Sequence, residues 1–310
     1  MAFKEYAYKE VGGGESLLAS VWYSPEVSET EKPIAHYFHG GSWVLGHKDM
    51  LSPDYVKELL DLGFGAVVSP NYRLAPTISA LDGPVQDAKD SYLWSQTKLP
   101  QLSARDANVH LNGNKVVTFG HSAGGSLALL MASMPQKPLA ILDVFGLKYF
   151  DDISYSTPNP AWAKLPDFNQ TLLDKIKEEV PPPSSAPAPG GPNGPDFTHH
   201  RIAWLFTSLK KGTWLKSVAP NEDYDSIDPG KLFSSSSPFP PTYFIHGSAD
   251  NLVDVKLSER AFEALKKRGV DTELVIEEGA PHGFDAGAKP GDHKYEIVAK
   301  GFKFLADYAI

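Results

Sequence analysis

The chain has 310 residues, of which 42% are hydrophobic and 11% aromatic, and this is enough for one large α/β domain or two small ones. Its formal net charge of −9 argues against nucleic acid or an anionic membrane surface as a partner. It contains no cysteine, which excludes disulfides, thiolate metal sites and a cysteine nucleophile.

The N-terminus lacks an apolar core of signal-peptide length, and no run approaches the roughly 18 apolar residues of a membrane span. We therefore expect a cytoplasmic protein without a membrane span. Residues 3–11 and 17–23 alternate apolar and polar side chains on either side of three glycines, which predicts an antiparallel hairpin. A polar loop should follow over residues 24–32.

Strands and helices then alternate along the chain. Periodicity, glycines and prolines predict strands over 34–38, 64–69, 115–119, 139–145, 242–245 and 272–276, and helices over 49–62, 83–97, 256–268 and 292–309. This alternation predicts the α/β fold class, with a mostly parallel twisted sheet and helices on both faces. The proline-bounded loop 70–76 carries Arg73, for which Asp87 is a candidate partner.

Residues 116–132 predict a strand, a sharp turn and a helix. The turn carries Gly120-His121-Ser122-Ala123-Gly124, the Gly-x-Ser-x-Gly pattern of a nucleophile elbow. Glycines let strand and helix approach closely around a strained serine, and the N-terminus of the helix favours developing negative charge. We interpret Ser122 as a nucleophile.

A second glycine pair, in His39-Gly40-Gly41-Ser42-Trp43, follows the strand over 34–38. Acyl transfer needs backbone N–H groups that face the oxyanion of a tetrahedral intermediate, and bare glycine backbone can approach a substrate closely. The N–H groups of Gly40, Gly41 and Ala123 are therefore predicted to form the oxyanion hole.

Residues 147–240 interrupt the alternation. The segment is rich in aromatic residues and contains a proline-rich stretch, 181–195, that can form neither a helix nor a central strand and is expected to be a mobile or polyproline-type loop. Short helices are predicted over 169–180 and 201–211. We interpret 147–240 as a cap inserted into a hydrolase core formed by 1–146 and 241–310, and its aromatic residues indicate a large apolar pocket. The predicted substrate contacts are Trp43, Tyr72, Tyr149, Trp204 and Phe284.

A serine hydroxyl needs a base within hydrogen-bond reach, and that base needs an orienting carboxylate. Asp250 and His282 each follow a predicted strand, as Ser122 does, so all three belong at one edge of the sheet. Asp254 remains an alternative acid. Among the other histidines, His246 is expected to lie buried in its loop and His121 to point away from the serine, and the pair His199 and His200 is expected to be solvated. We expect no metal site and no cofactor, because neither a zinc-binding spacing nor a dinucleotide fingerprint is present.

These motifs resemble those of α/β-hydrolases of the hormone-sensitive-lipase-like esterase group (alpha/beta hydrolase fold-3). The matching pieces are His39-Gly40-Gly41, Asn71 to Pro76, Gly120 to Gly125, Asp250 to Asp254 and Pro281 to Phe284. The chain departs from the family at Ser42, where a third glycine or an alanine is usual, and at His121, where aspartate is usual. With Trp43 close behind the glycines, these departures also resemble kynurenine formamidases.

The resemblance implies a serine hydrolase that acts through an acyl-enzyme on a carboxylic ester or thioester of a medium-sized apolar acyl group. Some hydrolases and thioesterases of fungal biosynthetic pathways are similar, which implies an alternative in which a polyketide chain is released as a lactone. An arylformamidase-like amide hydrolysis is a further alternative, and a non-catalytic hydrolase-fold receptor is a third class. The expected partner is a small-molecule acyl substrate, with an acyl carrier protein as a candidate for its delivery.

Overall fold

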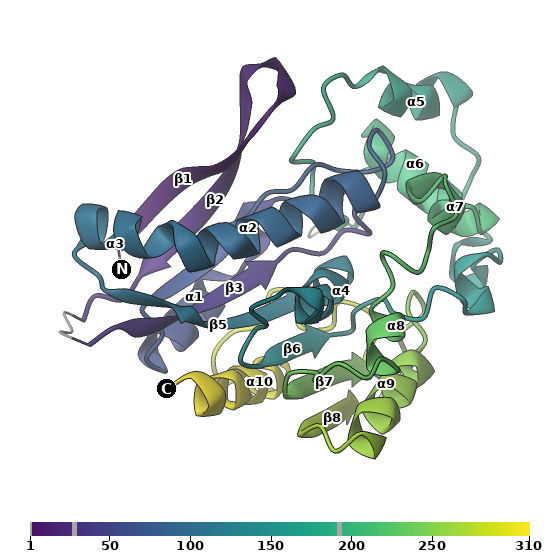
Figure 1. Ribbon diagram of the computed structural model, residues 1–310. Coiled ribbons are helices and arrows are strands. Elements are labelled where there is room, and N and C mark those ends of the chain that lie inside the picture. Colours follow the sequence, from purple (N-terminus) through teal and green to yellow (C-terminus); the bar gives the residue numbers. More distant parts are fainter. Residues whose placement is uncertain (1, 27–29, 191–193) are drawn as a thin grey trace.

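The computed structural model describes residues 2–26, 30–190 and 194–310, which form an eight-stranded sheet (Figure 1). The strand order is β1-β2-β4-β3-β5-β6-β7-β8. The strands are β1 (Ala2–Val11), β2 (Glu15–Tyr23), β3 (Lys32–Phe38), β4 (Ala66–Pro70), β5 (Leu111–His121), β6 (Ile141–Val144), β7 (Thr242–Gly247) and β8 (Thr272–Glu277). The predicted hairpin of β1 and β2 is antiparallel and joins β4 in antiparallel fashion, and the strands from β4 to β8 are parallel. This is the α/β-hydrolase fold that the sequence predicted.

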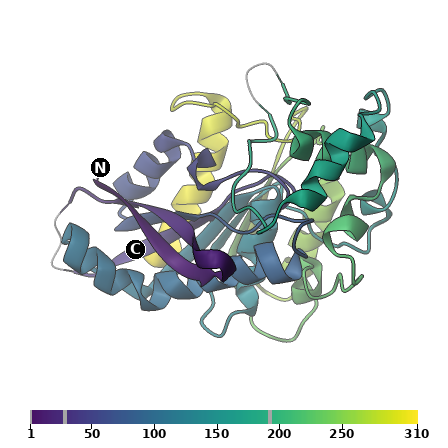
Figure 2. The same ribbon diagram turned by 90° about the horizontal axis from the view of Figure 1, so that it is seen from above.

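Helices cover both faces of the sheet, because side chains of each strand alternate between two apolar clusters. The helices are α1 (Pro53–Asp61), α2 (Gln86–Thr97), α3 (Leu99–Ala107), α4 (Ala123–Leu130), α9 (Val255–Lys267) and α10 (His293–Ala309). In β3, Ile34 and Phe38 face the cluster under α2, α4 and α9, whereas Ala35 and Tyr37 face the cluster under α1 and α10. Figure 2 shows α10, in yellow, on the side of the sheet opposite α2 and α3. Within the described ranges, no helix is both long and apolar enough to cross a membrane.

The segment between β6 and β7, called the insert here, contains α5 (Gln170–Asp174), α6 (His200–Lys211), α7 (Trp214–Val218) and α8 (Pro229–Phe233). In Figure 1 the arrows of β3, β5, β6 and β7 point toward the side on which α5, α6 and α7 lie. The insert therefore stands beyond the carboxyl ends of the parallel strands, where α/β folds place their sites.

Several elements differ from the sequence prediction, among them α7 and α8, which were not predicted. The helix expected over 169–180 is shorter: α5 ends at Asp174 and a 3₁₀ turn continues to Glu178. Pro181 follows, and a residue that precedes proline is steered away from helical backbone. Helix α3 was not predicted, and α1 begins at Pro53 rather than at residue 49 because Ser52 caps it.

The proline-rich stretch is docked on the core over the residues that can be described. Gly46 N donates to Pro187 O (3.2 Å), Ala186 N donates to Gly46 O (3.0 Å), and Leu74 N donates to Pro183 O (2.8 Å). The stretch that was expected to be a mobile or polyproline-type loop is therefore held on the core by backbone hydrogen bonds at Pro183, Ala186 and Pro187. Residues 191–193 of the predicted stretch, and 27–29 of the predicted polar loop, lie outside the described residues.

Arg73 and Asp87 meet as the sequence suggested. The guanidinium binds both carboxylate oxygens of Asp87, with Nε to Oδ2 at 2.9 Å and Nη2 to Oδ1 at 2.8 Å. Lys9 of the hairpin also reaches Asp87, at 2.6 Å. These ion pairs join β1, the loop after β4 and α2, and they have no part in the site described below.

Burial of two histidines predicts a loss of stability in acid. Burial lowers the pKa of both His36 and His39 to about 3, from an ordinary value of 6.5. Because the unfolded chain binds these protons first, the free energy of unfolding should fall by roughly 1.4 kcal/mol per pH unit for each histidine as the pH drops below 6.5. Urea unfolding of wild type and of His36→Gln between pH 7 and pH 4.5 measures this slope. The slope should be shallower in His36→Gln, and unchanged in His293→Gln, whose ring is exposed. Equal slopes in all three proteins would contradict the prediction.

Candidate active site

Ser122 lies between β5 and α4 in a conformation that few residues other than glycine adopt, with φ 55° and ψ −126°. A Cβ atom on Gly120 would lie 2.2 Å from Gly124 O, and one on Gly124 would lie 1.9 Å from Phe38 O. Glycine is therefore required at both positions for α4 to approach β3 and β5. The strain at Ser122 is of the kind that surrounding structure maintains at functional sites.

Three predicted residues from distant loops meet at this turn. Ser122 Oγ lies 3.0 Å from His282 Nε2, and His282 Nδ1 lies 2.7 Å from Asp250 Oδ2. Asp250 follows β7 and His282 follows β8. Asp254, the alternative acid, instead caps α9 by accepting a hydrogen bond from Lys256 N (3.0 Å). The arrangement has the hydroxyl–imidazole–carboxylate order of an activated nucleophile.

The carboxylate of Asp250 is fully buried yet well supplied with donors. Oδ1 accepts hydrogen bonds from Leu252 N (2.8 Å) and Val253 N (2.9 Å), while Oδ2 faces His282 and His246. Burial by itself raises the pKa of Asp250, but the hydrogen bonds from His246, His282 and Val253 outweigh it and hold the pKa well below its usual range. Asp250 therefore faces His282 as a charged carboxylate.

Gly40, Gly41 and Ser122 line one cavity, and a Cβ atom on Gly40 would lie 3.2 Å from Ser122 Cβ. Left-handed backbone runs through this loop, with φ 115° at Gly41, 56° at Ser42 and 60° at Trp43. Ser42 thus keeps a conformation that favours glycine. Among the turns and loops that can be described, no hydrogen bond uses the N–H of Gly40, Gly41 or Ala123 as its donor.

The cavity beside Ser122 has a volume of about 970 Å³. The core side of its wall carries Tyr37, Tyr55 and Phe145, and the insert contributes Trp162 and Phe206. Further wall residues are Met50, Leu51, Ala188, Pro189, Pro195, Leu205, Leu209 and Leu252. The wall is therefore mostly apolar and has the size of a small-molecule site.

The five aromatic residues predicted to contact substrate do not line this cavity, so that prediction needs correction. Trp43 is fully buried and donates from Nε1 to Ala123 O (3.1 Å), which ties the glycine loop to α4. Tyr72 stacks on His39 at 4.1 Å and donates to its carbonyl oxygen. Tyr149 stacks beneath Arg260 at 3.7 Å, Phe284 packs on Phe145, and Trp204 is half-buried on α6.

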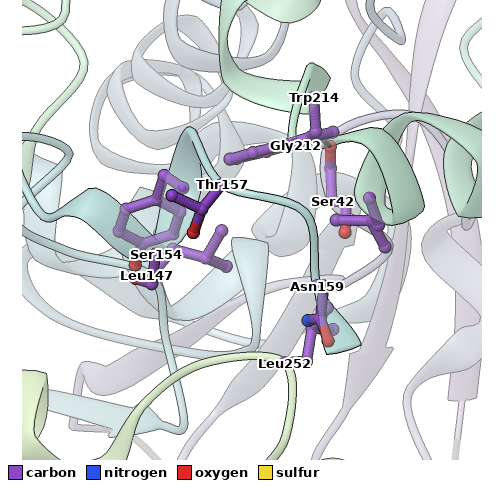
Figure 3. A pocket seen from close by; sticks show the side chains of 10 residues that line it. Ser42, Leu147, Ser154, Thr157, Asn159, Gly212, Trp214 and Leu252 are labelled. Atoms are coloured by element: carbon purple, nitrogen blue, oxygen red, sulfur yellow. Dashed lines mark hydrogen bonds between the residues drawn. The ribbon is translucent and has the colours of Figure 1, made fainter. Parts of the chain in front are cut away.

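A second, smaller cavity of about 30 Å³ lies under the insert (Figure 3). Figure 3 shows its wall, in which Ser42, Thr157, Asn159, Trp214 and Leu252 come from the glycine loop, the insert and the loop after β7. It has room for one or two water molecules. Ser122 does not line this small cavity, so the larger cavity is the one that can hold a reacting molecule.

The remaining histidines have partners of their own. His121 Nε2 lies 2.9 Å from Asp285 Oδ2, which also accepts from the Tyr55 hydroxyl at 3.0 Å, so its ring turns away from Ser122 as expected. His246 is fully buried. His200 binds Glu179 at 2.7 Å and His199 caps α6, so the pair is not simply solvated. No group of three metal-ligating side chains was found in the described part of the chain.

The sequence reasoning missed the residues that shape the cavity. Tyr37 and Tyr55 alternate with core residues and carry no distinguishing local signal. Lys148, which does not line the cavity, offered a signal of its own: a lysine four residues past the buried strand β6, and in the structure its ammonium group is fully buried.

Comparison with known proteins gives matches to both halves of the chain. A family model described as alpha/beta hydrolase fold matches residues 35–145, which include the glycine loop and the serine turn. A model of the prolyl oligopeptidase family matches residues 196–309, which include Asp250 and His282.

Curated relatives of the chain are polyketide synthases. The chain is 31% identical over 330 residues to the non-reducing polyketide synthase ausA of Emericella nidulans, a match that covers 94% of this chain and 13% of that protein. It is 30% identical over 324 residues to mapC' of Penicillium brevicompactum, covering 93% of this chain and 15% of that protein. The chain thus spans about one seventh of the length of these relatives.

Solved structures resemble the whole chain. A protein of unknown function from Staphylococcus aureus superposes with a TM-score of 0.74 at 20% identity, covering 99% of this chain and 100% of that one. An esterase from Pyrobaculum calidifontis gives 0.64 at 21% identity, covering 100% of this chain and 86% of that one. At these identities the likeness concerns the fold.

Proposed function

Because the chain belongs to the α/β-hydrolases, in their hormone-sensitive-lipase-like group, we propose that it is a serine hydrolase that cleaves esters or thioesters of a medium-sized apolar acyl group. The observation that carries the proposal is the hydrogen-bonded series of Ser122, His282 and Asp250. Ser122 and His282 line the 970 Å³ cavity, and Asp250 lies behind His282. Hydrogen-bond contact of hydroxyl with imidazole and of imidazole with carboxylate is what nucleophilic catalysis by serine requires.

The reaction follows from these positions. Ser122 Oγ attacks the acyl carbonyl carbon while His282 Nε2 takes the hydroxyl proton, and Asp250 stabilises the imidazolium that forms. The N–H groups of Gly40, Gly41 and Ala123 hold the oxyanion. The tetrahedral intermediate collapses as His282 returns the proton to the leaving alcohol or thiol, and the acyl group stays on Ser122. Water, deprotonated by His282, then releases the acid.

The substrate class rests on the cavity and on the relatives. We treat residues 147–240 as a cap, since its Trp162, Leu205 and Phe206 form one wall of the cavity opposite the core. An apolar wall favours an acyl chain over a charged one. The relatives named above are polyketide synthases, which supports a thioester substrate delivered by an acyl carrier protein.

A second candidate is release of the acyl chain as a lactone. Here a hydroxyl of the bound chain, rather than water, attacks the acyl-enzyme, and its proton passes to His282. The similarity to polyketide synthases supports this candidate. Lactone release needs the same acyl-enzyme and the same site residues as hydrolysis, and only the acceptor differs.

One experiment tests both candidates. The protein is first incubated with a fluorophosphonate probe, and labelling of Ser122 is expected within minutes if the hydroxyl is activated. A second, unlabelled sample of the protein is supplied with a hydroxyacyl thioester, and the products are identified by mass spectrometry. Free acid supports hydrolysis and a cyclic product supports lactone release. Absence of both labelling and thioester cleavage would overturn the proposal.

A further inference from the structure

Behind Asp250 lies a buried polar chain that the proposed reaction does not use. It begins with Asp143 of β6 and Lys148, whose side chains are fully buried and 2.8 Å apart. Lys148 Nζ also donates to Gly146 O and, at 2.9 Å, to Ser258 Oγ on α9. An ammonium group donates and never accepts, so Ser258 Oγ is the acceptor in its contact with Lys148.

The donor Lys148 favours one direction for the next hydrogen bond. Ser258 Oγ accepts from Lys148, so its own hydrogen is free to go to His246 Nδ1, which lies 2.7 Å away. The other ring nitrogen of His246 is consistent with this direction, because Nε2 faces two acceptors, Val253 O at 3.0 Å and Asp250 Oδ2 at 3.2 Å. A lone pair on Nε2 would be repelled by both, so the hydrogen belongs there.

We propose that Lys148 and Ser258 are positioning residues for Asp250: they hold His246 as the neutral tautomer with its hydrogen on Nε2, and this N–H donates to the carboxylate that orients His282. The inference rests on the proposed function. The chain of contacts runs Lys148, Ser258, His246, Asp250, and joins the ends of β6 and β7 with α9. All four side chains are buried, where hydrogen bonds are strongest and an unsatisfied group is most costly.

The titratable groups that face Asp250 are His246 of β7 and His282 of the loop after β8, with the Asp143–Lys148 pair behind His246. A donor from His246 spreads part of the negative charge of Asp250. Without it, the carboxylate presents more of its negative charge to the imidazole of His282.

The decisive variant is Ser258→Ala, measured as kcat/KM against pH. We expect about a tenfold lower plateau and an acidic limb displaced toward higher pH by roughly half a unit, while Ser258→Thr restores the wild-type profile. The matched control is Ser95→Ala. Ser95 is equally buried and its hydroxyl lies 2.9 Å from Nδ1 of another strand histidine, His36, which has no contact with Asp250. Its acidic limb should stay in place.

A measurement on the unmodified protein keeps the inference testable if Ser258→Ala fails to fold. Imidazole ¹⁵N NMR should show His246 with an unprotonated Nδ1 and a protonated Nε2. A protonated Nδ1, or an acidic limb in Ser258→Ala that matches that of Ser95→Ala, would overturn it. If wild type is labelled by the fluorophosphonate probe, such a result refutes only this inference. If wild type is neither labelled nor able to cleave the thioester, the proposed function itself fails.

Discussion

Replacing Ser122 by alanine should lower the rate of ester or thioester cleavage by on the order of 10⁴-fold or more, with the fold retained. The side chain that is removed is the only one at the serine turn that lies within hydrogen-bond distance of His282 Nε2, at 3.0 Å, among the described contacts. Residual activity would come from the oxyanion donors and from binding alone. Steady-state kinetics measure the rate of cleavage, fluorophosphonate labelling measures the reactivity of the serine, and a thermal melt shows whether the fold is retained.

Ser126→Ala provides the matched control for this loss. Ser126 lies four residues further along α4, is fully buried, and donates its hydroxyl to Leu147 O at 2.6 Å rather than facing the cavity. Its variant should keep activity within about tenfold of wild type and remain labelled, since it removes one ordinary hydrogen bond. Turnover or labelling that persists in Ser122→Ala would remove Ser122 from the mechanism.

Replacing Arg201 by methionine should produce the largest loss of stability, about 3–5 kcal/mol in the free energy of unfolding. The guanidinium is 1% exposed and binds Glu179, two core carbonyls, Val44 O at 2.7 Å and Ala75 O at 3.0 Å, and the Thr77 hydroxyl at 3.2 Å. Its removal deprives the half-buried carboxylate of Glu179 of its guanidinium partner, with His200 still beside it, and takes a donor from two buried carbonyls. Urea unfolding followed by fluorescence measures the change.

The same variant should also weaken substrate binding. Arg201 joins α6 to the loops after β3 and β4, and Leu205 and Phe206 of α6 form part of the cavity wall. We therefore expect KM to rise more than kcat falls. Arg201→Lys should restore little, because a single ammonium group cannot reach partners arranged around a planar fork. Arg105→Met, at an exposed pair with Asp106, should leave the unfolding midpoint nearly unchanged. Similar midpoints for Arg201→Met and Arg105→Met would contradict the assignment.

Much of the core was predictable because its signals are local. A β-branched strand, a glycine-flanked serine and an apolar helix in immediate succession leave few structures open, and β5, the serine turn and α4 are where they were predicted. The places of Asp250 and His282 followed from a topological rule, since residues that follow parallel strands share one edge of the sheet. Arg73 and Asp87 also met as predicted, because Asp87 lies on the helix that follows the Arg73 loop.

The insert could not be predicted to the same degree. Its aromatic residues follow no period of 2 or 3.6, so composition suggested an apolar cavity without indicating which rings would line it. Tyr149 was predicted to contact substrate and lies beneath Arg260 instead, while Phe206, two residues past the half-buried Trp204 on α6, reaches the cavity wall. The proline-rich stretch looked mobile because its partners, Gly46 and Leu74, are more than a hundred residues away in the chain.

The sequence by itself therefore determined the parallel α/β architecture, the serine turn and the order of a serine, an aspartate and a histidine at strand ends, because steric rules and hydrophobic periodicity act over a few neighbouring residues. Only the tertiary structure decided which of two aspartates faces His282, which side chains surround the cavity, and that Lys148 is connected to Asp250 through Ser258 and His246. Those outcomes depend on burial and on donor–acceptor pairing between segments far apart in the chain, and no local pattern encodes such pairings.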